Sequence, residues 1–155
     1  MKTKLSDNFW LNEFTKSNTA VRNGIQNVPT EVEIQRLVVL CDNVLQPLRE
    51  DINKIVSVNS GFRCLKLNRK LKSGDDSDHV KGFAADVEIN GMDNFELAEW
   101  IVRKYDYSQV ILEFYSNDSG DDPNSGWIHV SYIPENLKRE VLTIRKGETL
   151  LGLVK

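Results

Sequence analysis

The sequence has little cysteine, little net charge and no long hydrophobic run, and each shortage argues against a class of protein. Cys41 and Cys64 are the only two cysteines among 155 residues, so neither a disulfide framework nor a cysteine-rich zinc knuckle is expected. No apolar run approaches the ~20 residues that a membrane-spanning helix needs. The formal net charge is −3, which is unfavourable for binding duplex nucleic acid through its phosphates. We therefore expect no nucleic-acid partner and no membrane partner.

Length and composition favour one domain over residues 1–155. Hydrophobic residues make up 40% of the chain and charged residues 28%, far from the composition of a disordered chain. We expect residues 1–29 to form an arm packed on the body through Phe9, Trp10 and Phe14, and the protein to be a monomer. No apolar stretch follows the basic residues at the N-terminus, so no secretory signal is visible. This predicts synthesis in the cytoplasm and, if the protein is exported, another route.

The pattern of apolar residues predicts an α+β fold with strands that need not be parallel. A long helix is expected from Thr30 to about Asp51, with Thr30 and Glu33 forming a capping box and Pro47 marking a kink or the last turns. A second helix is expected to begin after Asp93. The other predicted elements are strands over 54–59, 82–89, 109–114 and 127–132, a short helix over 63–71, and a helical turn with a short closing strand or tail over 135–155.

The only two histidines, His79 and His129, stand in settings that suit metal ligation. His79 ends a polar loop, just before a strand that projects Asp86 from its polar face. His129 lies within a strand whose neighbouring residues are apolar, so its two ring nitrogens need partners. Two imidazoles and one carboxylate form a suitable catalytic zinc set with one position left for water. On spacing alone, two unrelated histidines remain an alternative, because His-x6-Asp is a weak pattern.

Four ordered motifs make the chain resemble a known family. Residues 77–86 fit S-x-H-x-x-G-x-A-x-D, and residues 127–131 fit W-x-H-x-S. Residues 60–63 with Asn68 resemble an S-G-[YF]-R…N segment, and residues 109–113 resemble a Q-x-I-x-E strand. Together they are similar to the zinc D,D-peptidases of the M15 (D-Ala-D-Ala carboxypeptidase) family, and the resemblance runs from about residue 5 to residue 133. It implies a small, mostly antiparallel sheet flanked by helices, as in D,D-peptidases and hedgehog domains.

The resemblance also assigns roles. It implies that His79, Asp86 and His129 bind Zn²⁺, and that Glu113 takes a proton from the zinc-bound water that attacks an amide bond. On pattern alone, an outward-facing charge at a strand edge is the more common explanation for Glu113. The implied substrates are the stem or cross-link peptides of peptidoglycan, with action on the cell wall and release by a phage lysis route as one possibility.

Three further residues are candidates for substrate binding. The resemblance implies that Arg63 binds a substrate carboxylate or stabilises the oxyanion, although arginines after a strand are commonly surface residues. Ser77 either hydrogen-bonds near the first metal ligand or caps the end of the loop. Trp127 is expected partly in the core and partly in the wall of the cleft. The acidic loop residues Asp75, Asp76, Asp121 and Asp122 are expected to serve solvation and turn formation rather than metal binding.

Two departures keep other functions open. Vancomycin-resistance dipeptidases place their base three residues before the last histidine, where this chain has Gly126, so the base must come from the earlier strand. Hedgehog-type domains share the metal scaffold yet act as signalling ligands, so a non-catalytic, zinc-stabilised binding module for a wall peptide or a protein partner is the main alternative. A carbohydrate-active enzyme using Asp86 and Glu113 is a weaker one, because it leaves both histidines unexplained. The sequence does not indicate which peptide bond is cut; residues 72–77 and 116–126 are expected to decide it.

Overall fold

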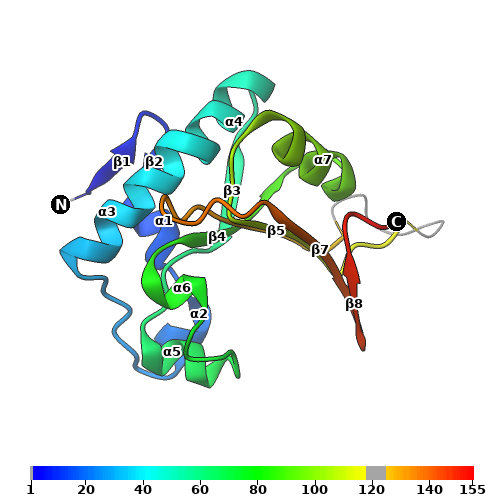
Figure 1. The fold of residues 1–155 in the computed structure, drawn as a ribbon. Coiled ribbons are helices and arrows are strands. Elements are labelled where there is room, and N and C mark those ends of the chain that lie inside the picture. The colour runs from blue at the N-terminus through cyan, green and yellow to red at the C-terminus, as the bar shows by residue number, and fades with distance from the viewer. Residues whose placement is uncertain (1, 118–124) are drawn as a thin grey trace.

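The computed structural model describes residues 2–117 and 125–155. The N-terminal arm is more regular than predicted (Figure 1), because strands β1 (Lys4–Ser6) and β2 (Phe9–Trp10) form a small antiparallel hairpin before helices α1 (Leu11–Thr15) and α2 (Asn18–Arg22). Phe9 and Phe14 are buried in the core as expected. Trp10 was expected to be a third anchor, which is wrong: its ring is exposed, with the Lys4 ammonium 5.6 Å from its centroid.

The predicted long helix is present as three consecutive segments, α3 (Glu31–Leu40), a π-helical turn η1 (Cys41–Leu45) and α4 (Gln46–Ile52). The wide turn ends two residues before Pro47, whose ring would clash with the carbonyl of residue 43 in a regular α-helix. Thr30 does precede the helix, but the predicted capping box is wrong in detail. Its hydroxyl donates to the Glu33 carboxylate and accepts no hydrogen bond from the helix backbone.

Six strands form one sheet, which confirms the predicted α+β class with a mostly antiparallel sheet. Only the β5–β7 pair is parallel. In spatial order the strands are β3 (Val56–Ser60), β4 (Ala84–Ile89), β6 (Trp127–Ser131), β5 (Gln109–Glu113), β7 (Glu140–Arg145) and β8 (Glu148–Leu151). The prediction for residues 135–155 is therefore partly wrong, because that segment contributes two paired strands and no helical turn.

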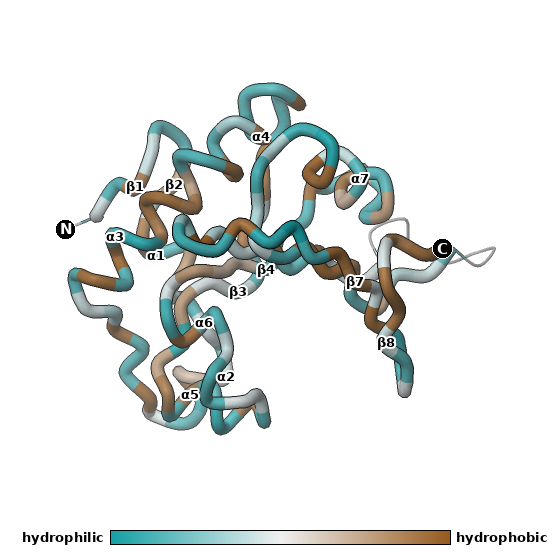
Figure 2. Tube along the Cα trace, viewed as in Figure 1, coloured by the Kyte–Doolittle hydropathy of each residue, from teal (hydrophilic) through white to brown (hydrophobic). Residues whose placement is uncertain are grey.

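The helices divide between the two faces of the sheet. Figure 1 shows α4 and helix α7 (Asn94–Lys104) on one side, and helices α5 (Leu65–Lys70) and α6 (Asp78–Lys81) on the other. Asp93 caps α7 as predicted, since its carboxylate accepts from the Glu96 backbone N–H at 3.0 Å. In Figure 2 the long helix and α7 alternate between hydrophobic and hydrophilic residues, as expected for helices with one buried face.

The core lies between the sheet and the long helix with α7. Alternate residues of β4 and β6, among them Ala85, Val87, Ile128 and Val130, enter this core and are fully buried. The residues between them face the side of the sheet where α6 lies. That face carries the polar groups described next. No helix in the described part of the chain is long and apolar enough to cross a membrane.

Candidate metal centre and cleft

Two neighbouring strands place Asp86 and His129 side by side. The antiparallel register of β4 and β6 pairs these two residues directly, so their side chains leave the same face of the sheet. Both are buried, at 6% and 8% exposure. The apolar residues that alternate with them anchor the opposite face in the core, which fixes the direction of both polar side chains.

His79 is not on the sheet but on a short helix that the sequence analysis did not predict. It lies within α6, where a polar loop was expected to run directly into the strand. Its ring Nδ1 is 2.7 Å from the carbonyl oxygen of Gly61. Because a carbonyl only accepts, Nδ1 carries the proton, and the neutral ring turns the lone pair of Nε2 toward Asp86 and His129.

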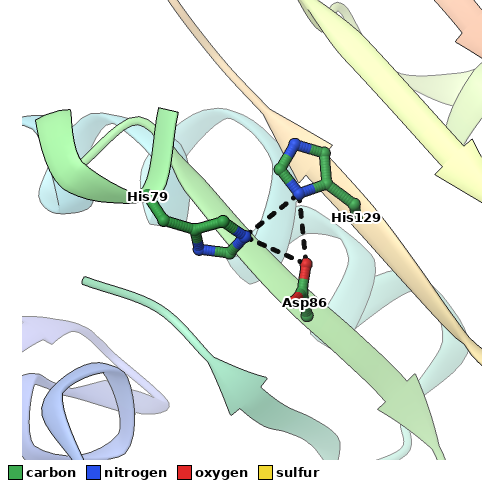
Figure 3. A group of neighbouring side chains, drawn as sticks. All are labelled: His79, Asp86 and His129. Atoms are coloured by element: carbon green, nitrogen blue, oxygen red, sulfur yellow. Dashed lines mark hydrogen bonds and ion pairs between the residues drawn. The ribbon is translucent and has the colours of Figure 1, made fainter. Parts of the chain in front are cut away.

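The three side chains converge on one point (Figure 3). His79 Nε2 lies 3.2 Å from Asp86 Oδ1 and 3.2 Å from His129 Nδ1, and the third side of the triangle, His129 Nδ1 to Asp86 Oδ1, is 3.1 Å. A tetrahedral zinc ion with ligand bonds of about 2.0–2.1 Å separates its ligand atoms by about 3.3–3.4 Å. The three donor atoms therefore fit a divalent ion of this size with little adjustment, and together they could hold one.

Charge favours a cation at this point. Burial opposes ionisation of Asp86, but the His79 and His129 rings, whose nitrogens lie 3.1–3.2 Å from Asp86 Oδ1, outweigh burial and hold the pKa of the Asp86 carboxyl well below its usual range. Asp86 is therefore a carboxylate at neutral pH. A buried carboxylate beside two imidazole lone pairs is a typical environment for a divalent ion.

Glu113 lies at the end of β5, directly across from Trp127 in the register with β6. The Trp127 indole N–H donates to Glu113 Oε2 at 2.8 Å and so orients the carboxylate. Burial, reinforced by the negative charge of Asp86, raises the pKa of Glu113 above its ordinary value. Glu113 lines the same cleft as the three converging residues. This favours a role for Glu113 in the site over the alternative that it is an outward-facing charge at a strand edge.

Arg63 also reaches this centre. Its Nε donates to the Ser60 hydroxyl at 3.0 Å, and its Nη2 lies 3.4 Å from Asp86 Oδ2. The side chain is only 15% exposed, so the interpretation as an ordinary surface arginine is wrong. Arg63 lines a cleft of about 460 Å³ together with the three converging residues and Glu113.

Ser77 and Trp127 both line the cleft as well. The Ser77 hydroxyl accepts from the His79 backbone N–H at 3.3 Å, so it caps the helix that carries His79. Trp127 is half-buried and packs against Phe114 with ring centroids 5.4 Å apart, consistent with a mixed role in core and cleft wall.

Asp75 and Asp76, the acidic loop residues that the structure describes, lie outside the converging group. Asp75 forms a two-bond ion pair with Arg69, with the shorter distance 2.7 Å, and Asp76 lines the cleft without joining the cluster. Asp121 and Asp122 lie outside the described residues, as does most of the predicted specificity segment 116–126.

The backbone around Gly126 leaves no room for an acidic side chain three residues before His129. Its φ is +72°, a conformation that favours glycine. A Cβ at this position would lie 2.1 Å from the carbonyl oxygen of Glu113. The backbone of the strand that carries Glu113 therefore occupies the space that a side chain at residue 126 would need. This agrees with the expectation that an acidic residue of the site lies on β5 instead.

The sequence analysis assigned no role to Asn27, which joins the arm to the site. Asn27 donates to the carbonyls of Thr15 at 3.0 Å and Phe62 at 2.9 Å, and its side-chain oxygen accepts from the Cys64 backbone N–H at 2.7 Å. It thereby holds the backbone on both sides of Arg63. An asparagine before a proline-containing helix start gives no signal of such long-range bonds, so only the tertiary structure identifies it.

Replacing Asn27 by alanine should lower the free energy of unfolding by about 2 kcal/mol, because three backbone groups lose their partner at once. Urea denaturation followed by circular dichroism measures this. Asn23→Ala is the matched control: Asn23 is on the same arm, but its side chain makes one exposed bond to Thr19, and its loss should cost under about 0.5 kcal/mol. Equal effects of the two substitutions would show that Asn27 is no clamp.

A His-Asp-His group that could hold a metal ion lines the cleft with a carboxylate beside it, an arrangement typical of metallopeptidases. A family model described as Peptidase M15 matches residues 7–131. The chain therefore belongs to the M15 peptidase family. A search of curated proteins finds no significant match.

Proposed function

We propose that this protein is a zinc-dependent peptidase that hydrolyses amide bonds in the stem or cross-link peptides of peptidoglycan, and that it acts on the cell wall. The observation that carries the proposal is the triangle of donor atoms, with sides of 3.1–3.2 Å, at the floor of a cleft that Glu113 and Arg63 also line. Membership of the M15 family supports peptidase chemistry at this site.

His79, Asp86 and His129 are the proposed metal ligands. One carboxylate and two imidazoles suit zinc better than calcium or magnesium, which prefer sets made only of oxygen. When bound, zinc supplies Lewis-acid polarisation of the scissile carbonyl and lowers the pKa of water from 15.7 toward about 7. Gly61 supports this assignment, because its carbonyl holds the His79 ring in the tautomer that ligation requires.

Glu113 is the proposed general base. It accepts one proton from the attacking water and passes that proton to the departing amine, so one water is consumed and a carboxylic acid and an amine are formed. The half-buried setting raises its pKa above that of an ordinary glutamate, which makes it a stronger proton acceptor. The Trp127 indole N–H fixes one carboxylate oxygen and leaves the other for this transfer.

Arg63, Ser77 and Trp127 are the proposed substrate-contacting residues. Ser60 and Asp86 hold Arg63 through Nε and Nη2, and the guanidinium lines the cleft, where it can bind an oxyanion or a carboxylate. Ser77, the residue before α6, and Trp127, on β6, both line this cleft.

The test is digestion of purified peptidoglycan by the zinc-loaded protein, with mass spectrometry of the released muropeptides. We expect fragments that differ from the undigested material by one hydrolysed amide bond, and none after treatment with a chelator. The mass of the fragments identifies the bond. A non-catalytic binding module would bind the wall and release nothing in either condition.

A further inference from the structure

The residue that follows Glu113 has an unusual backbone conformation. Phe114 comes directly after β5 with φ at +54°, in the left-handed region that glycine adopts freely and that crowds the Cβ of other residues. It is the only aromatic residue among the described non-glycine residues with positive φ, which are Asn53, Lys72, Phe114 and Arg139. The conformation is strained for a bulky side chain, and such strain persists only where surrounding contacts hold it.

Backbone contacts on both sides of Phe114 fix this conformation. Its N–H donates to the carbonyl of Ile144 at 2.9 Å, which continues the pairing with β7 one residue past the end of β5. A Cβ at Gly126 would lie 2.6 Å from the Phe114 carbonyl carbon, so the chain that enters β6 passes in direct contact with this turn. A glycine at residue 114 would adopt the same conformation without strain. The strain therefore belongs to the side chain, and the contacts of that side chain must offset it.

The Phe114 side chain contacts Trp127. The two ring centroids are 5.4 Å apart and the ring planes are inclined by 38°, within the range of stabilising aromatic pairs. Trp127 lines the cleft, whereas Phe114 is 48% exposed and is not among the described residues that line it. The Phe114 ring thus packs on a residue of the cleft wall without being part of that wall.

Trp127 in turn connects Phe114 to the proposed base. The strand register places Trp127 directly across from Glu113, and the indole N–H donates to Glu113 Oε2 at 2.8 Å. The register fixes the backbone of Trp127, but two side-chain torsions decide where the indole N–H points. Packing against the Phe114 ring restricts these torsions. A general base must be held close to its reactive geometry, so the ring contact bears on the proton transfer.

We infer that Phe114 is a positioning residue for the proposed base. Its ring holds Trp127 in the orientation in which the indole N–H binds Glu113, and this contact is the reason that a bulky side chain occupies a left-handed position. The inference rests on the proposed function and adds a residue to it. Because Phe114 acts through Trp127 and does not line the cleft, its loss should affect the chemical step and not substrate binding.

The test compares Phe114→Ala, Phe114→Gly and Phe114→Tyr in the full-length, zinc-loaded protein. Alanine and glycine both remove the ring, but only glycine relieves the left-handed strain, so Phe114→Gly should melt about 2–4 °C above Phe114→Ala. Phe114→Tyr keeps both the ring and the strain. Phe95→Ala is the matched control, because it removes an aromatic partner of Tyr115, the next residue along the chain, with ring centroids 5.9 Å apart.

Activity should follow the ring and not the stability. With soluble muropeptides prepared by a muramidase as substrate, kcat should fall about tenfold in both Phe114→Ala and Phe114→Gly, while KM and zinc occupancy stay within about twofold. Phe114→Tyr and Phe95→Ala should keep kcat within about twofold of the wild type. Recovery of kcat in Phe114→Gly relative to Phe114→Ala would show a merely structural role, and a rise in KM at constant kcat would show a substrate contact. Either result overturns the inference.

A second measurement needs no turnover. Hydrogen exchange of the Trp127 indole N–H, followed by nuclear magnetic resonance and assigned with Trp127→Phe, reports directly on its bond to Glu113. Exchange should be at least about tenfold faster in Phe114→Ala and Phe114→Gly than in the wild type, and unchanged in Phe114→Tyr and Phe95→Ala. Equal exchange in all these proteins would refute the positioning role. Absence of hydrolysis by the wild-type protein would instead refute the proposed function and leave the exchange result to decide the role of Phe114.

Discussion

Replacing His129 by alanine should reduce bound zinc from about one ion per chain to under a tenth. The reason is geometric: His129 Nδ1 is one corner of the triangle, and Asp86 and His79 alone leave a divalent ion with two protein ligands. Inductively coupled plasma mass spectrometry on protein dialysed against a small excess of zinc measures the change. Hydrolysis of peptidoglycan should be lost together with the metal.

Thermal unfolding provides a second readout for the same substitution. Zinc should raise the melting temperature of the wild-type protein, because the ion binds the folded site and not the unfolded chain, and it should leave His129→Ala unchanged. Ser131→Ala is the matched control. Ser131 lies on the same strand and face, is fully buried, and its hydroxyl has no hydrogen-bond partner among the described residues, so its removal should leave zinc binding intact. Full zinc occupancy in His129→Ala would remove this residue from the ligand set.

Replacing Glu113 by glutamine should separate metal binding from catalysis: zinc should be retained while hydrolysis falls by about 10²- to 10⁴-fold. Glutamine keeps an oxygen that can accept from the Trp127 indole N–H, so the cleft wall is preserved while the proton acceptor is lost. Release of muropeptides with time, at equal zinc occupancy, measures the effect. Unchanged turnover would mean that the base is another group.

The same variant tests the electrostatic setting of Glu113. Burial raises the pKa of this carboxyl in the folded protein, so the folded state favours its protonated form. The resulting stabilisation is present below the unfolded pKa of about 4.3 and is lost as pH rises through the higher folded value. In metal-free protein at pH 7, Glu113→Gln should therefore melt at a higher temperature than the wild type, and the difference should vanish near pH 4. A lower melting temperature at pH 7 would show that the carboxylate is stabilising.

The strand-borne part of the site could be predicted from the sequence, because alternation alone determines it. Ala85 and Val87 on either side of Asp86, and Ile128 and Val130 on either side of His129, indicate which face is buried and thus which way the polar residues point. That Asp86 and His129 are paired across β4 and β6 could not be predicted from the sequence. The orientation of the His79 ring could not be predicted either, because the bond from the ring to the Gly61 carbonyl joins residues 18 apart in sequence.

For the C-terminal segment the sequence analysis predicted at most one short strand, although the connection between the two observed strands carried a signal. Lys146-Gly147 is a two-residue connection with φ of +75° at the glycine, and it joins β7 to β8. A turn residue and a glycine between two runs of β-branched and apolar residues are typical of a hairpin. The parallel pairing of β7 with β5 had no local signal, because it depends on a crossover and not on a turn.

Anomalous diffraction at the zinc absorption edge, on crystals of the zinc-loaded protein, tests the central claim most directly. The account predicts one strong peak about 2.0–2.2 Å from His79 Nε2, an Asp86 carboxylate oxygen and His129 Nδ1, with the Glu113 carboxylate facing it across the cleft. A peak at other residues, or full zinc occupancy with these three side chains turned away from the ion, would contradict it.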